Sequence, residues 1–118
     1  MTINVLGTEY TVTVKKYDED EAFERSGIAG YCDSATRRIV VCDMSTYHEM
    51  RYESKETQHW EQIRIMRHEI VHAFFCESGL DANTNPISDA WARNEELVDW
   101  IAIQGPKIWK AWEEAGAI

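Results

Sequence analysis

Apolar and polar residues alternate near the start of the chain. Tyr10, Val12 and Val14 share one face of an extended segment, with threonines between them. A period of two is typical of a β-strand with one buried face. A glycine separates this strand from another short extended segment over residues 3–6. We therefore predict a β-hairpin in this part of the chain.

A second hairpin is predicted from residues 31–34 and 38–42, with its turn near residues 33–36. Gly27 and Gly30 are predicted to mark turns before it. If one strand of this hairpin lies at a sheet edge, an extended peptide could add to it as a further strand. An ordinary packed hairpin is an equally weighted interpretation.

Residues 56–77 follow a helical period instead. Ser54 or Thr57 could cap the start, Gly79 follows the end, and no proline interrupts the segment. One apolar stripe recurs at helical spacing and is predicted to face the core. The stripe consists of Trp60, Ile63, Ile70, Val71 and Phe74.

Turn-forming residues separate this helix from the C-terminal part of the chain. They are Gly79, Asp81, Asn83, Asn85, Pro86 and Ser88. A second helix is predicted from about residue 91 to residue 104. Gly105 and Pro106 are predicted to end it and to open a third helix, because glycine suits a helix exit and proline a first turn. The residues predicted to pack the third helix are Ile108, Ala111 and Trp112.

These elements predict an α+β fold, with a small antiparallel β-sheet of N-terminal hairpins followed by three helices. A chain of 118 residues is expected to form a single domain over residues 1–118. Hydrophobic residues make up 44% of the chain, which is enough to bury a core and argues against a disordered segment.

Charge and cysteine content narrow the function classes. A net charge of −9 argues against nucleic acid or an anionic membrane surface as the main partner, although it would suit a basic peptide. The start of the chain does not resemble a signal peptide, and no stretch is long enough to cross a bilayer, so we expect a cytoplasmic protein. Three cysteines fit a reducing compartment. Cys32 and Cys42 are expected to be unpaired buried thiols, with a cross-strand disulfide as the alternative.

The first predicted helix carries the candidate chemistry. His68 and His72 stand four residues apart, so both imidazoles project from one helix face and can reach a single metal ion. Glu69 points to one side of that pair, near enough to act on a water beside the metal. The pattern His-Glu-x-x-His on a helix therefore indicates the start of a zinc (Zn²⁺) hydrolase site.

A catalytic zinc site normally has a third protein ligand. The best candidate is Glu95, because the roughly twenty residues after His72 allow a second helix to return across the first. Asp99 lies one turn later on the same face, where its carboxylate could accept the second N–H of a ligating histidine. Glu96 is the rival ligand, because Glu96 and Asp99 also share a face.

Cys76 and His59 are weaker candidates. Cys76 continues the spacing of His68 and His72, but eight residues of helix span about 12 Å, too far for three side chains to share one ion at bonds near 2 Å. Cys76 is therefore predicted to be a small buried residue. His59 lies two turns before the motif and is predicted to face solvent.

Two motifs together resemble the pattern of the gluzincin metallopeptidases. They are H-E-x-x-H over residues 68–72 and N-E-x-x-x-D over residues 94–99. The strands before the first motif and the string RHEIVHAFF…NEELVDWIA resemble compact phage and prophage metallopeptidases of the ImmA/IrrE and SprT-like groups. The resemblance covers about residues 28–104.

The resemblance implies a role for each matching residue. It implies that His68, His72 and Glu95 bind zinc, that Glu69 is the general base, and that Asp99 supports His68. It does not identify the residue that stabilises the transition state. Candidates for that role are Tyr31, Tyr47, His48 and Arg93, each of which has an ordinary surface or packing role as its alternative.

The expected function is a zinc-dependent endopeptidase that hydrolyses a protein or peptide substrate, in a phage or mobile-element setting. The first alternative is a non-catalytic module that binds zinc or docks a partner on a degenerate metallopeptidase fold. An intact Glu69 counts against it, because a structural zinc site needs no base. The second alternative is a helical core domain without a metal. The sequence sets neither the substrate nor the oligomeric state.

Overall fold

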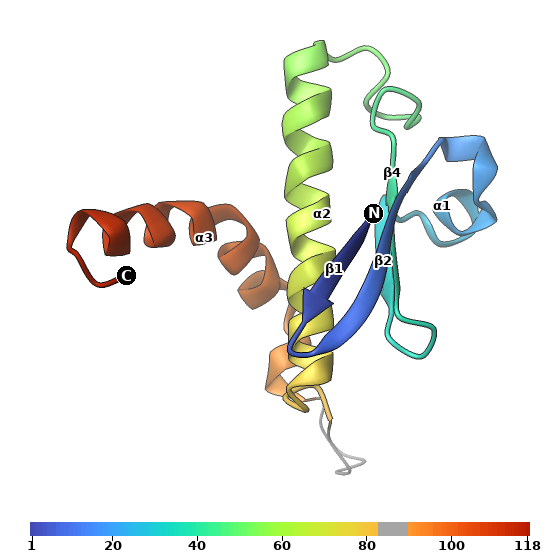
Figure 1. Ribbon diagram of the computed structural model, residues 1–118. Coiled ribbons are helices and arrows are strands. Elements are labelled where there is room, and N and C mark those ends of the chain that lie inside the picture. The colour runs from blue at the N-terminus through green and yellow to red at the C-terminus, as the bar shows by residue number, and fades with distance from the viewer. Residues whose placement is uncertain (83–89) are drawn as a thin grey trace.

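A computed structural model describes residues 1–82 and 90–118. The fold is α+β, as predicted, with a four-stranded sheet followed by helices (Figure 1). The strands are β1 (Thr2–Val5), β2 (Thr8–Lys15), β3 (Gly30–Asp33) and β4 (Arg38–Cys42). The helices are α1 (Glu21–Ser26), α2 (Lys55–Glu77) and α3 (Glu95–Glu114), with 3₁₀ turns at Tyr17–Glu19 and Trp91–Arg93. The residues outside the described ranges include the predicted turn positions Asn83, Asn85, Pro86 and Ser88.

The strands are ordered β1-β2-β4-β3 across the sheet. Both predicted hairpins form, because β1 pairs antiparallel with β2 and β3 pairs antiparallel with β4. The prediction of an antiparallel sheet is wrong at its centre, where β2 and β4 run parallel and Val12 lies opposite Ile39. Residues 39–42 are all buried, and a continuous apolar run of this kind is typical of a strand covered on both faces. Alternation along one strand carries no information about the direction of its neighbour.

Helix α2 lies along one face of the sheet, and α1 lies on the other side (Figure 1). Ser54 caps α2, as predicted, because its Oγ accepts a hydrogen bond from the backbone N–H of Thr57 at 3.1 Å. The helix begins one residue before the predicted start and ends where predicted, at Glu77. Local capping and the absence of proline were therefore sufficient to place this element.

The predicted apolar stripe of α2 is confirmed only in part, because Ile70 packs against the core whereas Trp60 and Phe74 are exposed. Trp60 is 57% exposed and Phe74 is 40% exposed. The buried residues of the helix are Ile65, Glu69 and Ala73. Apolar side chains occur all around α2, so their spacing does not identify one buried face. The buried face also includes the charged residue Glu69, which a pattern of hydrophobic residues leaves out.

The C-terminal region forms one helix where the sequence predicted two. Helix α3 begins at Glu95, after a 3₁₀ turn, and continues through Gly105 and Pro106 to Glu114. Proline inside a helix removes one hydrogen bond and costs about 3 kcal/mol, which the surrounding helix contacts must offset.

The second half of α3 extends away from the sheet and α2 (Figure 1). The predicted packing residues Ala111 and Trp112 are exposed there, and Ile108 is only partly buried. The first half of the helix packs through Val98 and Ala102, both buried. Only this first half therefore contributes to the candidate site.

Gly27 and Gly30 have different roles from each other. Gly27 ends α1 in the left-handed region at φ 62°, which agrees with the predicted turn. Gly30 is the first residue of β3, so its predicted turn is wrong. A Cβ at Gly30 would lie 2.7 Å from Cγ2 of Ile65 and 3.2 Å from Cγ of Glu69. The missing side chain lets β3 approach α2 closely.

Replacement of Gly30 by alanine is expected to lower the free energy of unfolding by about 1–3 kcal/mol, because the added methyl overpacks the contact between β3 and α2. Urea denaturation would measure the change. The control is Gly105→Ala, where, neighbouring residues of the helix apart, nothing lies within 4 Å of an added Cβ. Alanine is favoured over glycine in a helix by roughly 0.5–1 kcal/mol, but its Cβ would meet the ring of the following Pro106, so the control is expected to change stability little. Equal stability of the two variants would contradict the close approach at Gly30.

The three cysteines are free, as predicted for Cys32 and Cys42. Cys42 is buried, Cys32 is partly buried, and Cys32 lies opposite Ile39 in the strand pairing rather than opposite Cys42. Cys76 is partly buried. Among the described residues, no helix combines the length and the apolar character that a membrane crossing requires.

Candidate metal centre

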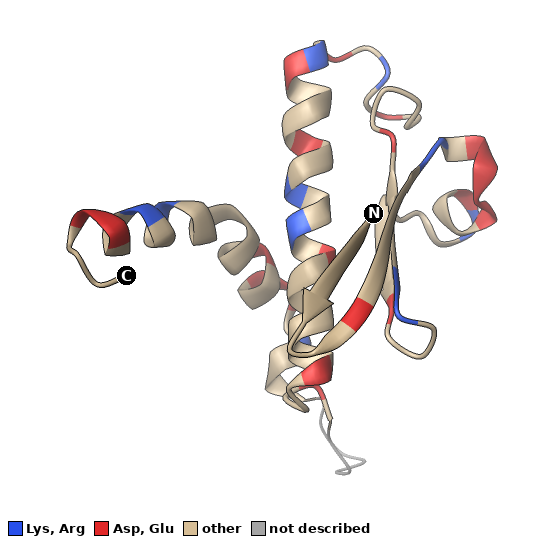
Figure 2. Ribbon diagram, in the orientation of Figure 1, with Lys and Arg blue, Asp and Glu red and all other residues tan. Residues whose placement is uncertain are grey.

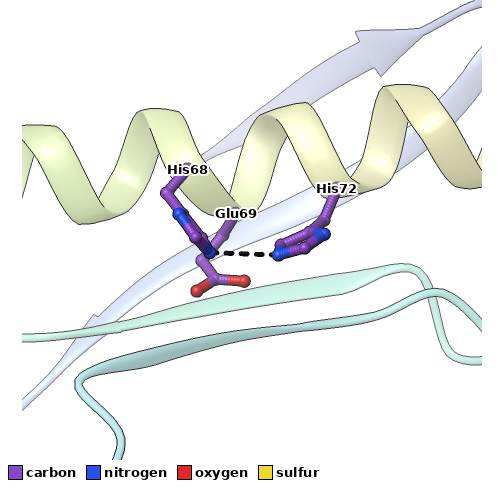
Figure 3. Close-up of side chains that lie close together, drawn as sticks. All are labelled: His68, Glu69 and His72. Carbon is purple, nitrogen blue, oxygen red and sulfur yellow. Dashed lines mark hydrogen bonds between the residues drawn. The ribbon is translucent and has the colours of Figure 1, made fainter. Parts of the chain in front are cut away.

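Helix α2 places three side chains of the first motif at one point. His68 and His72 lie one turn apart, and their Nε2 atoms are 3.0 Å apart. Glu69 extends from the same side of the helix into the space beside the two rings (Figure 3). The possible ligand atoms of these three residues lie within 4.8 Å of one another. His68, Glu69 and His72 therefore form a group that could hold a metal ion.

Helix α3 brings a second carboxylate to the two imidazoles. Glu95 is the first residue of α3, directly after Asn94, whose side chain caps the helix by accepting a hydrogen bond from the Leu97 N–H at 2.9 Å. Oε2 of Glu95 lies 2.9 Å from Nε2 of His68, and Oε1 of Glu95 lies 3.3 Å from Nε2 of His72.

The rival carboxylate on α3 lies elsewhere. Both glutamates are exposed, but Glu95 lines the cavity at the histidines and Glu96 does not. Successive helix residues are rotated by about 100°, so two adjacent glutamates cannot both face α2. Of the two sequence candidates for a third ligand, Glu95 is the one in contact with the imidazoles.

The separations and the chemistry of these donor atoms would suit one metal ion, for which zinc distances give the scale. Bonds of about 2.0–2.1 Å in a tetrahedral site put ligand atoms roughly 3.3 Å apart, and the separations between His68, His72 and Glu95 are 2.9, 3.0 and 3.3 Å. Two acceptor atoms this close also require a proton or a cation between them. Imidazole nitrogens and a carboxylate are common zinc ligands.

Asp99 lies one turn after Glu95, as predicted, and contacts the other nitrogen of His68. Its Oδ1 is 2.9 Å from Nδ1 of His68. An ionised carboxylate only accepts hydrogen bonds, so this contact places the proton of His68 on Nδ1 and leaves the Nε2 lone pair directed toward Glu95 and His72. The contact corresponds to the support that the sequence predicted for Asp99.

Among the described residues, Glu69 is the one charged residue that is buried, with 7% of its surface exposed. Burial raises the pKa of Glu69 to about 7, and the negative charges of Glu95 and Asp99 act in the same direction while His68 opposes them. A carboxyl group with a pKa near neutrality can both accept and return a proton at neutral pH.

The site opens into a cavity of about 800 Å³. One wall is formed by β3 and the segment before it, residues 27–32, and other parts are formed by Tyr47, Met50 and Arg93. Strand β3 is at the edge of the sheet, as the sequence suggested for one strand of residues 31–42. Acidic residues gather at the end of α3 that meets α2 (Figure 2). The candidate centre is therefore reachable from solvent along a sheet edge.

The four candidates for stabilising an oxyanion differ in position. The hydroxyl of Tyr31 donates a hydrogen bond to Asp20 at 2.7 Å, so its proton is already engaged although the side chain lines the cavity. His48 packs against Tyr17, with ring centroids 6.2 Å apart, and is not a lining residue. Tyr47 and Arg93 line the cavity and remain candidates.

The structure also reveals residues that sequence reasoning missed. Arg64 and Glu61 line the cavity, and Arg64 contacts Asp99. The helical spacing of Glu61, Arg64 and His68 can be read from the sequence, but the contact between Arg64 and Asp99 cannot. Cys76 lines the cavity but is outside the group that could hold a metal ion. His59 is exposed, as predicted.

No protein-family model, curated protein or solved structure matches this chain. The resemblance to gluzincin metallopeptidases therefore depends on the residues of the two motifs alone.

Proposed function

We propose that this chain is a zinc-dependent endopeptidase whose ion is held by His68, His72 and Glu95. The observation that carries the proposal is the convergence of two helices on one point. Their three ligand atoms lie 2.9–3.3 Å apart, beside a buried glutamate and within an open cavity. A bound zinc would supply a more acidic water and a polarised substrate carbonyl.

In this proposal Glu69 is the proton-transfer group, because its buried side chain lies beside the two imidazoles. Its carboxylate accepts a proton from the water that attacks the carbonyl carbon of the peptide bond. As the bond between carbon and nitrogen breaks, the same carboxyl group returns that proton to the leaving amine. Asp99 meanwhile keeps Nδ1 of His68 protonated, so that Nε2 is the nitrogen available to the ion.

The substrate class proposed for this site is an extended peptide. Among residues 1–82 and 90–118, no strand pairs with the outer edge of β3, and β3 lines the cavity that contains His68 and Glu69. A peptide that added to this edge would be held by main-chain hydrogen bonds with its carbonyl groups near the ion. Main-chain recognition of this kind tolerates many sequences, so specificity would come from the side-chain contacts of the cavity.

Metal stoichiometry and peptide cleavage test the proposal. Protein stripped of metal and then dialysed against Zn²⁺ is expected to bind one equivalent by elemental analysis and to cleave members of a random peptide library. A chelator should abolish cleavage and added Zn²⁺ should restore it. Zinc binding without cleavage would support a non-catalytic module instead, and failure to bind zinc would support a domain without a metal.

Replacement of Glu95 by glutamine is expected to weaken zinc binding by about 10²-fold, because a neutral amide is a poor ligand where a carboxylate faces both imidazoles. The matched control is Glu96→Gln, which removes the same charge from the neighbouring exposed position and should leave zinc affinity nearly unchanged. Competition with a chromophoric chelator measures both affinities. A larger loss in the Glu96 variant would identify Glu96 as the ligand.

A further inference from the structure

Arg64 links the two helices that form the candidate centre. It stands on α2 one turn before His68, and its Nη1 donates a hydrogen bond to Oδ1 of Asp99 on α3 at 2.9 Å. Its Nε and Nη2 both donate to the carboxylate of Glu61, with the Nε bond at 3.1 Å. The guanidinium group is therefore held at both ends, on Glu61 of its own helix and on Asp99 of the other.

The two contacts of Asp99 share one oxygen atom. Oδ1 accepts from Arg64 and is also the atom 2.9 Å from Nδ1 of His68. The side chain of Asp99 is 42% exposed, so little packing restricts its rotation, whereas that of Arg64 is 24% exposed. A partly exposed carboxylate with one partner would sample other rotamers. The second donor restricts it to the orientation that meets His68.

We propose that Arg64 is a positioning residue of the metal centre. It fixes the Asp99 carboxylate against Nδ1 of His68 and so fixes the direction in which Nε2 of His68 meets the ion. This inference rests on the proposed metal site, and it assigns to Arg64 a role beyond joining two helices. A residue that only joined the helices would affect stability without changing how the ion is bound.

Arginine is suited to this role by its shape. The planar guanidinium group presents donors in fixed directions, so one group can bind Glu61 with two nitrogens and Asp99 with a third. Lysine keeps the positive charge but carries a single rotating ammonium group. Arg64→Lys therefore separates the effect of geometry from the effect of charge.

Titration of the metal-free protein with Co²⁺ tests the proposal, because the visible absorption of Co²⁺ reports both affinity and coordination geometry. Arg64→Lys is expected to bind Co²⁺ up to about 10-fold more weakly than the unmodified protein, because loss of the group that contacts a ligand directly, here Asp99, costs about 10–100-fold. Its absorption bands are expected to shift. The control is Arg67→Lys, an exposed arginine on the same helix, which should change neither quantity.

A double-mutant cycle distinguishes positioning from simple stabilisation. In an Asp99→Ala background, Arg64→Lys should have almost no further effect on Co²⁺ affinity, because the group through which Arg64 acts is gone. Should Arg64→Lys fold poorly, Glu61→Gln frees the guanidinium group without removing it and is expected to weaken Co²⁺ binding several-fold. An unchanged affinity and spectrum in Arg64→Lys, or an equal loss in both backgrounds, would overturn the role of Arg64. Failure of the unmodified protein to bind Co²⁺ would overturn the metal site itself.

Discussion

Replacement of Glu69 by glutamine is expected to lower peptide hydrolysis by about 10²–10⁴-fold while zinc remains bound. Glutamine has nearly the same shape, so the buried contact of this side chain with the sheet is retained. Its amide cannot accept a proton from the attacking water. The ligands proposed on α2 and α3 are unchanged, so the metal content should stay at that of the unmodified protein.

The same variant should change how stability depends on pH. Burial raises the pKa of Glu69 from an ordinary value of 4.5 to about 7, so the unfolded chain loses this proton at lower pH than the folded chain does. The neutral form therefore favours folding fully below about pH 4.5, and this contribution is lost as the pH rises through 7. This difference in pKa between the unfolded and the folded chain corresponds to roughly 3 kcal/mol of folding free energy. Metal-free Glu69→Gln should lack this loss and be the more stable protein at pH 8.

The measurements are single-turnover cleavage of a library-derived peptide, zinc content by elemental analysis, and urea denaturation of the metal-free protein at pH 5 and pH 8. The matched control is Glu56→Gln, an exposed glutamate in the first turn of the same helix. It should change neither cleavage nor zinc content, and any loss of its favourable contact with the helix N-terminus should be nearly equal at pH 5 and pH 8. Full cleavage activity in Glu69→Gln would refute its assignment as the base. Loss of zinc in this variant would instead make Glu69 a ligand, the other role open to it in the group with His68 and His72.

Local features of the sequence predicted local structure well. The cap at Ser54 and the lack of proline placed α2, and period-two alternation with a glycine turn placed the first hairpin. The pattern of Asn94, Glu95 and Asp99 correctly put two carboxylates one turn apart at the start of a helix, facing the histidines. Apart from the contact with the histidines, which joins two helices, each of these features depends on residues within a few positions of one another.

Two errors are local, namely the helix break predicted at Gly105 and Pro106 and the turn predicted at Gly30. The other errors concern contacts between distant segments. The parallel pairing of β2 with β4 depends on how the chain crosses over through α1, which no strand pattern encodes. The buried face of α2 is set by the sheet beneath it, and Glu69 on that face belongs to the candidate site rather than to the hydrophobic pattern. Arg64 was missed for the same reason, because Asp99, the partner that gives it a role, lies on another helix. The chemical roles of the site residues stay predictions until metal binding and cleavage are measured.

Replacement of His72 by alanine is expected to remove zinc. The Nε2 atom of His72 lies 3.0 Å from that of His68 and 3.3 Å from Oε1 of Glu95, so its loss leaves two protein ligands and opens one side of the site to water. Zinc sites bind with about 10 kcal/mol or more, so one of three ligands accounts for roughly 3 kcal/mol or about 10²-fold in affinity. Because the lost ring also orients its neighbours, we expect the loss to reach about 10³-fold.

Elemental analysis after dialysis and competition with a chelator measure the effect of His72→Ala, and His59→Ala is the matched control. His59 lies on the same helix but is exposed and does not line the cavity, so its removal should leave zinc affinity unchanged. His72 itself is only partly buried, and the loss of its ring should cost less folding stability than metal affinity. Thermal unfolding of the metal-free variants checks that distinction. Unchanged zinc content in His72→Ala would show that the ion, if one binds, is held by other residues, and the endopeptidase proposal would then lack its metal site.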